Sequence, residues 1–277
     1  MVSIKSIRKY IKQINALVER NIYLELRYKL SIVTSNFAPF IRILMPLIVF
    51  NVIFIIREDY QFGYWTGQTY VLFLFIAFCI QFLRKIVDNF IQLFNRERYW
   101  KTLQALMVAP INKYVLLFGF LISELLLLSI PFIIFFIIAY ILFPINIFNL
   151  FLVILGFISL AIIFGCIGLI TGILIITKEG VYNLFHLGLL IVFWMSCISY
   201  PLQIFPEFIQ SLILLNPIYY CIDIIRILWL MGFNYDLAIS FLTPLHIVIV
   251  LAGTIAMPIF SVYLFNTFYD KFGISGY

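Results

Sequence analysis

Charged residues are scarce in this sequence. Only 11% of its 277 residues are Asp, Glu, Lys or Arg, and 65% are apolar, whereas an average soluble domain contains about 25% charged residues. A soluble core of this size cannot bury so much apolar surface, so the composition excludes a soluble globular domain. Long apolar runs are instead typical of helices that cross a membrane. The sequence therefore predicts an all-α polytopic membrane protein, with a single transmembrane domain over residues 1–277.

Residues that carry catalysis are also few. The two histidines, His186 and His246, both lie in apolar runs, and neither has metal-ligand spacing. The sequence contains no GxxxxGK(S/T) phosphate loop, so the chain does not bind ATP by that route. We predict no catalytic residue, no metal site and no cofactor in this chain. The cysteines are widely separated without a CxxC pair, and we interpret them as small apolar packing residues: Cys79, Cys166, Cys197 and Cys221.

The first 30 residues combine positive charge with a helical repeat of apolar side chains. They contain no uninterrupted apolar run of the kind that follows a short basic start in a signal peptide. We therefore predict an amphipathic helix over residues 1–30 that lies in the headgroup plane, where cations meet anionic lipids. Its apolar face consists of Ile4, Ile7, Ile11, Ile14, Val18 and Ile22, and its basic residues are Lys5, Arg8, Lys9 and Lys12.

Six apolar runs follow between residues 31 and 269, each near or above the ~20 residues that cross the hydrocarbon layer. We predict six transmembrane helices. The third run is ~45 Å long as a helix, so it should tilt or project beyond the bilayer. Gly168 and Gly172 form a GxxxG motif, which favours close packing within the chain over a dimer contact. The predicted spans are 31–56, 67–86, 114–143, 150–177, 182–200 and 243–269.

The basic residues predict the topology. Fifteen of the 18 Lys and Arg residues fall in the first 30 residues, in the 84–113 region, or at Lys178 and Lys271. Since Lys and Arg are enriched in cytoplasmic loops, we expect both termini to be cytoplasmic. The net charge of +6 is explained by this topology, and we expect no nucleic-acid partner.

The longest polar interruption between the apolar runs begins at Arg96. It opens with Arg96, Glu97, Arg98 and Lys101 and then becomes amphipathic until Pro110. Apolar residues at helical spacing predict a cytoplasmic helix over residues 96–110. An ordinary polar loop with a surface helix accounts for the same pattern, because amphipathic surface helices are common.

Residues 201–242 are too apolar for a water-exposed loop and are interrupted by Pro201, Pro206 and Pro217. One interpretation is a seventh span. The other is a pair of half-helices that enter the membrane and return, which is tolerated where protein buries them. Asp223 and Arg226 lie three residues apart and can pair on one helix face.

Two charges lie within apolar spans, where charged groups are costly and often paired or functional. They are Arg42 in the first span and Glu124 in the third. We hypothesise that they pair, within one chain or across a dimer. Alternatively, Arg42 extends toward the headgroups and Glu124 is protonated or bonded to a hydroxyl group.

The polar stretch from Arg96 resembles the cytoplasmic loop between the second and third spans of type-2 ABC exporter permeases. Lys101 stands where that pattern has glycine, and Gln104 where it often has glutamate. The stretches 200–201, 205–207 and 215–220 look like the outer re-entrant hairpin before the last span of these permeases, here 201–231. The matching loop residues are Arg96, Glu97, Arg98, Tyr99, Thr102, Leu103, Leu106, Pro110, Ile111 and Gly119.

The resemblance implies partners and roles. Two copies of the chain, or one copy and a close paralogue, would pair in a prokaryotic plasma membrane. Two separate ABC ATPase subunits would bind ATP and Mg beneath them. The resemblance assigns coupling to the ATPase to Arg96, Glu97, Arg98, Tyr99, Thr102, Leu103, Leu106 and Pro110. It assigns an outer gate to Phe205, Tyr219, Tyr220, Asp223 and Arg226.

The function implied is ATP-driven export of a hydrophobic drug-like, lipid or glycolipid substrate, because the spans contain few polar groups. A polysaccharide or teichoic-acid exporter is the closest alternative. A passive channel does not require the loop pattern at Arg96. A membrane-embedded lipid-modifying enzyme requires a cluster of Asp, His or Arg at one membrane face, which the sequence does not display.

Overall fold

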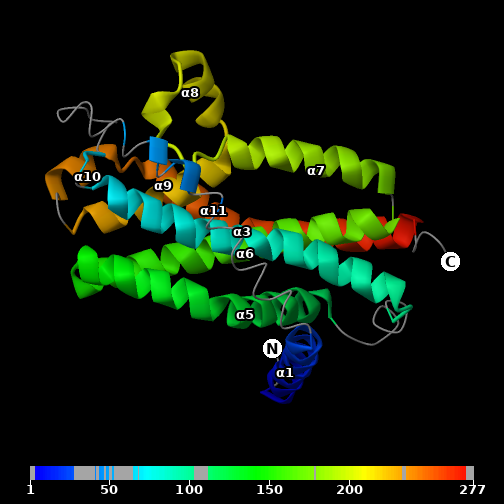
Figure 1. Cartoon of the computed structure of the whole chain (residues 1–277). Coiled ribbons are helices and arrows are strands. Elements are labelled where there is room, and N and C mark those ends of the chain that lie inside the picture. The colour runs from blue at the N-terminus through cyan, green and yellow to red at the C-terminus, as the bar shows by residue number, and fades with distance from the viewer. Residues whose placement is uncertain are drawn as a thin grey trace.

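The computed structural model describes residues 4–27, 41, 44–46, 48–49, 52, 65–67, 69–102, 112–177, 179–232 and 235–272. The elements in this part are helices, as the sequence predicts (Figure 1). The first predicted span, including Arg42, lies largely outside the described residues. The helices are α1 (Ile4–Leu26), α3 (Tyr70–Tyr99), α5 (Lys113–Leu142), α6 (Ile147–Thr177), α7 (Glu179–Trp194), η1 (Leu202–Ile204), α8 (Glu207–Ile213), α9 (Pro217–Leu230), α10 (Tyr235–Phe241) and α11 (Pro244–Phe272).

Four helices of the described part, α3, α5, α6 and α11, are long and apolar enough to cross a membrane. They run side by side in Figure 1 and correspond to the second, third, fourth and sixth predicted spans. The fifth predicted span corresponds to α7, which has 16 residues and is therefore only ~24 Å long. Helices α8 and α9 form a pair bent by 95°, the geometry of a broken span or a re-entrant segment.

The close packing of α3 and α6 depends on glycine. A Cβ atom placed on Gly168 would lie 2.8 Å from Cγ of Phe90, and one placed on Gly172 would overlap the ring of Phe94. The GxxxG motif therefore brings two helices of the same chain together, as the sequence predicts. Helices α3 and α6 form the buried centre of the bundle, whereas most of α5 and α11 is exposed along the sides.

Helix α1 lies across the bundle rather than along it. In Figure 1 it is seen nearly end-on beneath α5, while the long helices run across the view. Leu17 packs against Gly119 of α5, and Nδ2 of Asn21 donates to Oγ of Ser123 at 3.3 Å. If the long helices cross a membrane, a helix at this angle lies close to the membrane plane, which is the orientation expected of an interfacial helix.

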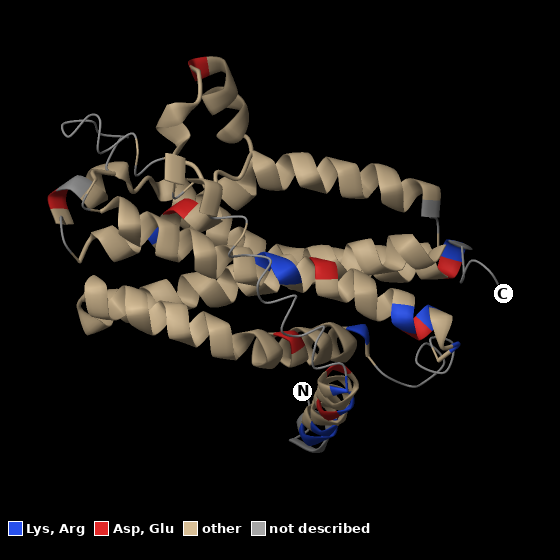
Figure 2. Ribbon diagram, in the orientation of Figure 1, with Lys and Arg blue, Asp and Glu red and all other residues tan. Residues whose placement is uncertain are grey.

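Charged side chains gather toward one end of the bundle. Figure 2 shows basic residues along α1 and where α3 and α11 end, while the centre of the bundle carries few charges. Helices α8 and α10, whose first turns contain Glu207 and Asp236, lie toward the opposite end of the bundle in Figure 1, on the predicted outer side. The structure thus segregates basic residues from these two acids, as a membrane topology requires.

Candidate functional site

Glu97 is the centre of a polar cluster at the basic end of the bundle. The residue is completely buried, and its carboxylate forms an ion pair with Arg20 of α1. Oγ1 of Thr102 donates to its second oxygen at 2.5 Å, and the Thr102 backbone N–H donates to the Glu97 carbonyl at 3.1 Å. One carboxylate thereby joins α1, the last turn of α3 and the segment that follows α3.

A second ion pair joins the same two helices, but here α1 supplies the acid and α3 supplies the base. Nη1 of Arg96 lies 2.5 Å from Oε1 of Glu25, so α1 presents a cation to Glu97 and an anion to Arg96. Sliding α1 along α3 would bring like charges together, which costs free energy. The two pairs therefore fix the register of α1 on α3. We call Arg20, Glu25, Arg96 and Glu97 the crossed ion pairs.

The predicted helix of residues 96–110 does not begin at Arg96, because residues 96–99 form the last turn of α3. These residues are good helix formers, and nothing interrupts the helix before Lys101. Lys101 has a φ of 58°, in the left-handed region that glycine adopts most readily. This conformation gives a physical reason for glycine at that position in the pattern that the loop resembles. Leu103, Leu106 and Pro110 lie outside the described residues.

The predicted coupling residues divide into two groups. Arg96, Glu97 and Thr102 make the intramolecular contacts above, and Nη1 of Arg98 donates to the Ile175 carbonyl near the end of α6 at 3.4 Å. Tyr99, in contrast, is 84% exposed at the tip of α3. Among the predicted coupling residues that the structure describes, Tyr99 is therefore the one best placed to meet another protein.

Glu124 of α5 is buried and accepts a hydrogen bond from Nδ2 of Asn89 in α3 at 2.5 Å. It follows Ser123, the residue that contacts Asn21 of α1, so it lies near the level of the interfacial helix. The predicted pairing with Arg42 falls outside the described residues. Glu124 of α5 is thus held by the side-chain amide of Asn89 in α3.

Replacing Asn89 by leucine is expected to lower the free energy of unfolding by about 1–3 kcal/mol, because the buried Glu124 carboxylate loses a donor. Changing Asn89 and Glu124 to leucine together should cost less than the sum of the two single changes. Thermal unfolding of the four purified forms in detergent measures this. Strictly additive losses would show that the two side chains do not depend on each other.

Sequence reasoning missed the partners of the predicted residues. Arg20 and Glu25 of α1 form the crossed ion pairs, and Asn89 holds Glu124. The available signal was the occurrence of acidic residues, Glu19 and Glu25, in an otherwise basic segment. That signal does not identify which acid is paired, since Glu19 is exposed.

Arg226 is the anchor of the second polar cluster, on the predicted outer half of the bundle. It is 1% exposed, and its Nη2 donates to the carbonyls of Cys197 and Ile198 at 2.8 and 2.7 Å. Its guanidinium carbon lies 4.2 Å from the ring centre of Phe73 in α3. Arg226 therefore joins α9 to α3 and to the segment that follows α7.

Asp223 connects α9 to α11. Its Oδ2 accepts from the Tyr219 hydroxyl at 3.2 Å and lies 3.3 Å from Nε2 of His246. Nδ1 of His246 lies 2.7 Å from the Thr243 hydroxyl. The sequence suggested that Asp223 can pair with Arg226 on one helix face, and the contacts described here also connect Asp223 to α11 and Arg226 to the segment after α7. His246, which the sequence placed in an apolar run without metal-ligand spacing, bridges these polar groups.

The predicted outer-gate residues lie in one region of the structure, where Phe205 packs against the cluster that contains Tyr219 and Tyr220. Tyr219, Tyr220, Asp223 and Arg226 are all buried, and the Tyr220 hydroxyl donates to the Leu214 carbonyl at 3.0 Å. Phe205 packs edge-on against Trp194 at 5.9 Å between ring centres. In this structure α9 is mostly buried, whereas η1 and α8 are largely exposed.

The family model described as ABC-2 type transporter matches residues 12–230, from α1 to the end of α9. The chain belongs to the ABC-2 type transporter family. None of the curated proteins compared with the chain matches it significantly. As an ABC-2 type transporter, the chain is a membrane-embedded permease component of an export system, and the family normally works with an ATPase subunit.

The first polar cluster of this ABC-2 type transporter lies inside the matched residues, and the second extends beyond them through Thr243 and His246. No group of three or more His, Cys, Asp or Glu residues in the described ranges is arranged to hold a metal ion. The clusters instead consist of ion pairs and hydrogen bonds that join separate helices. Such contacts can hold the helices in place and can pass a displacement of one helix to another.

Proposed function

We propose that the chain is the membrane subunit of an ATP-driven exporter, and that a separate ABC ATPase binds ATP and Mg for it. The observation that carries this proposal is the pair of crossed ion pairs next to the exposed Tyr99. A partner protein that binds the turn after α3 can displace several helices together. Glu97 and Arg98, which precede that turn, form bonds with α1 and α6.

The route of coupling starts at the exposed tip of α3. Displacement of Tyr99 moves Thr102 and Glu97, which are joined by hydrogen bonds. Glu97 carries the displacement to α1 through Arg20, and Arg98 carries it to the end of α6. In this mechanism Glu97 and Arg98 are positioning residues inside the permease, and Tyr99 is the residue that contacts the ATPase.

We further propose that two copies of the chain, or one copy and a close paralogue, form the transport path in a prokaryotic plasma membrane. Helix α7 has large exposed apolar side chains, including Leu184, Leu187 and Trp194, and Phe208 extends this surface on α8. A second copy placed there would bury them. A hydrophobic drug-like, lipid or glycolipid substrate suits such an apolar path, and a polysaccharide or teichoic acid is the alternative cargo.

Affinity purification from native membranes in a mild detergent tests the proposal. The tagged chain should bring down a phosphate-loop ATPase, and the complex should have the mass of two permease chains with two ATPase chains. Tyr99→Ala should reduce the co-purified ATPase activity about tenfold, because a tyrosine anchor at an interface commonly contributes more than 1 kcal/mol.

The matched control is Tyr263→Ala, which removes a tyrosine that is 65% exposed on α11, away from the tip of α3. This variant should retain the ATPase. A parent chain that purifies alone under several mild conditions would contradict the exporter proposal. Equal retention of the ATPase by both variants would contradict only the contact at Tyr99.

A further inference from the structure

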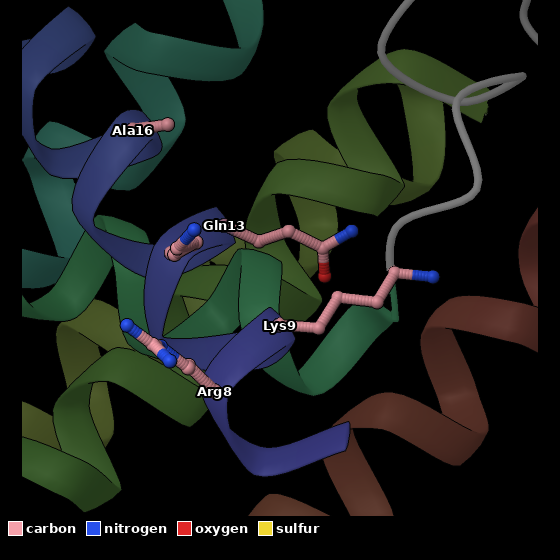
Figure 3. Close-up of a pocket in the computed structure, with 5 residues that line it drawn as sticks. Arg8, Lys9, Gln13 and Ala16 are labelled. Atoms are coloured by element: carbon pink, nitrogen blue, oxygen red, sulfur yellow. The ribbon is translucent and has the colours of Figure 1, made fainter. Parts of the chain in front are cut away.

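The first half of α1 carries a surface cavity of about 430 Å³. Its lining in the described part of the chain is Arg8, Lys9, Lys12, Gln13 and Ala16 (Figure 3). Three of these five residues are cations. In Figure 3, the side chains of Lys9 and Gln13 extend from α1 in the same direction. The cavity lies on the half of α1 that precedes the crossed ion pairs.

Gln13 has an unsatisfied polar group in this cavity. Its Oε1 atom is buried, and no residue in the described ranges forms a hydrogen bond with it. The oxygen and nitrogen of a glutamine amide are exchanged by a 180° flip, so the buried position suits either an acceptor or a donor. An unpartnered buried polar group costs about 1–3 kcal/mol. Gln13 as a residue is only half-buried, so a rotation of its amide toward the cavity would allow a ligand with hydroxyl or phosphate groups to satisfy it.

The charges beside Gln13 select an anion. Arg8, Lys9 and Lys12 are exposed, and none of them forms an ion pair with an acidic residue within the described ranges. Glu25, an acid of the same helix, is paired with Arg96. The first half of α1 therefore has a positive charge that the described part of the protein does not balance locally.

We propose that the cavity formed by Arg8, Lys9, Lys12 and Gln13 binds the headgroup of an anionic phospholipid. Helix α1 lies across the long helices, so this cavity faces the level at which lipid phosphates are concentrated. Lys9 contacts the phosphate beside Gln13. Arg8, which extends to the other side of α1 in Figure 3, and Lys12 add positive charge to the site. The Gln13 amide bonds to the phosphate or to a headgroup hydroxyl. Basic residues at a membrane surface attract anionic lipids in this manner.

The lipid site has a consequence for coupling, and this part rests on the proposed function. The same helix holds the lipid through its first half and α3 through Arg20 and Glu25 in its second half. A bound headgroup keeps α1 in the headgroup plane while α1 moves with α3. The displacement that α1 receives from Glu97 then stays parallel to the membrane and does not pull α1 away from it. Anionic lipid should therefore increase the transport obtained per ATP hydrolysed.

Lipid binding itself is tested without the ATPase. The purified permease is placed in nanodiscs of phosphatidylcholine with increasing phosphatidylglycerol, and bound phosphatidylglycerol is counted by native mass spectrometry after release into detergent. The parent should retain phosphatidylglycerol. The Arg8→Gln/Lys12→Gln variant should bind it at least tenfold more weakly, since each cation near the surface contributes about 1 kcal/mol. Gln13→Leu should also weaken binding.

Arg27→Gln is the matched control, because it removes an exposed cation that follows α1 and does not line the cavity. It should bind like the parent. Unchanged binding by the Arg8→Gln/Lys12→Gln variant would overturn the proposal, as would displacement of the lipid by millimolar inorganic phosphate. If that variant kept the lipid but lost a co-purifying ATPase, the basic face would be a protein-docking surface and the lipid proposal would be wrong.

Discussion

The Gly172→Val variant is expected to lose most of its folded protein. A Cβ at position 172 would overlap the ring of Phe94, which is fully buried and packs edge-on against Phe120 at 5.8 Å between ring centres. Phe94 also lies 6.1 Å from Phe265 of α11, so it has no space to withdraw. We expect a loss of about 3 kcal/mol or more, which lowers the melting temperature by about 6–12 °C.

Gly188→Val is the control for this prediction. Gly188 lies in α7, also a helix, and no atom lies within 4 Å of a Cβ placed there. The same substitution should therefore change the melting temperature little. Phe94→Ala in the Gly172→Val background should recover part of the loss by making room. If both glycine variants were equally stable, close packing of α3 on α6 would not depend on Gly172.

The Glu97→Gln variant should abolish most transport while ATP hydrolysis by the partner continues. The substitution removes the charge that pairs with Arg20 and weakens the connection from α3 to α1. Breaking a buried ion pair costs about 3–5 kcal/mol, and the 34% exposure of the Arg20 side chain reduces this toward the lower limit. We expect transport to fall at least tenfold, measured alongside ATPase activity in proteoliposomes.

Two further variants separate coupling from folding. Glu19→Gln removes an exposed acid from the residue before Arg20 and should leave transport unchanged. The Arg20→Gln/Glu97→Gln variant leaves no uncompensated charge, so it should regain stability relative to Glu97→Gln without regaining transport. Full transport by Glu97→Gln would mean that the ion pair with α1 is not part of the coupling route.

Apolar runs were sufficient to predict the helical class and the four long apolar helices α3, α5, α6 and α11, because local sequence determines which segments can cross a membrane. They were insufficient at the end of α3. The helix continues to Tyr99 because charged residues extend it, and it ends at the left-handed conformation of Lys101. A lysine in the sequence does not predict a left-handed backbone conformation.

The role of Glu97 shows why site residues are harder to predict than spans. Its position in a charged stretch suggested a surface contact, yet the carboxylate is fully buried against a partner 77 residues earlier in the chain. The same limit applies to Asp223 and Arg226. Their spacing suggested a local pair, and the folded chain adds contacts from α11 and from the segment after α7. Such contacts arise only in the tertiary structure.

If α1 lies at the membrane surface, its crossing over α5 gives the depth of the bundle in the bilayer. Contacts at Gly119 and Ser123 fall on the seventh and eleventh residues of α5, so ~9–15 Å of this helix extends to the polar side of α1. The 30-residue helix is ~45 Å long, which leaves ~30–36 Å on the other side, close to the hydrocarbon thickness of a typical bilayer. With α1 at the surface, the first ~9–15 Å of α5 extend beyond the lipid on the polar side. The rest of the helix then fits the membrane without a steep tilt.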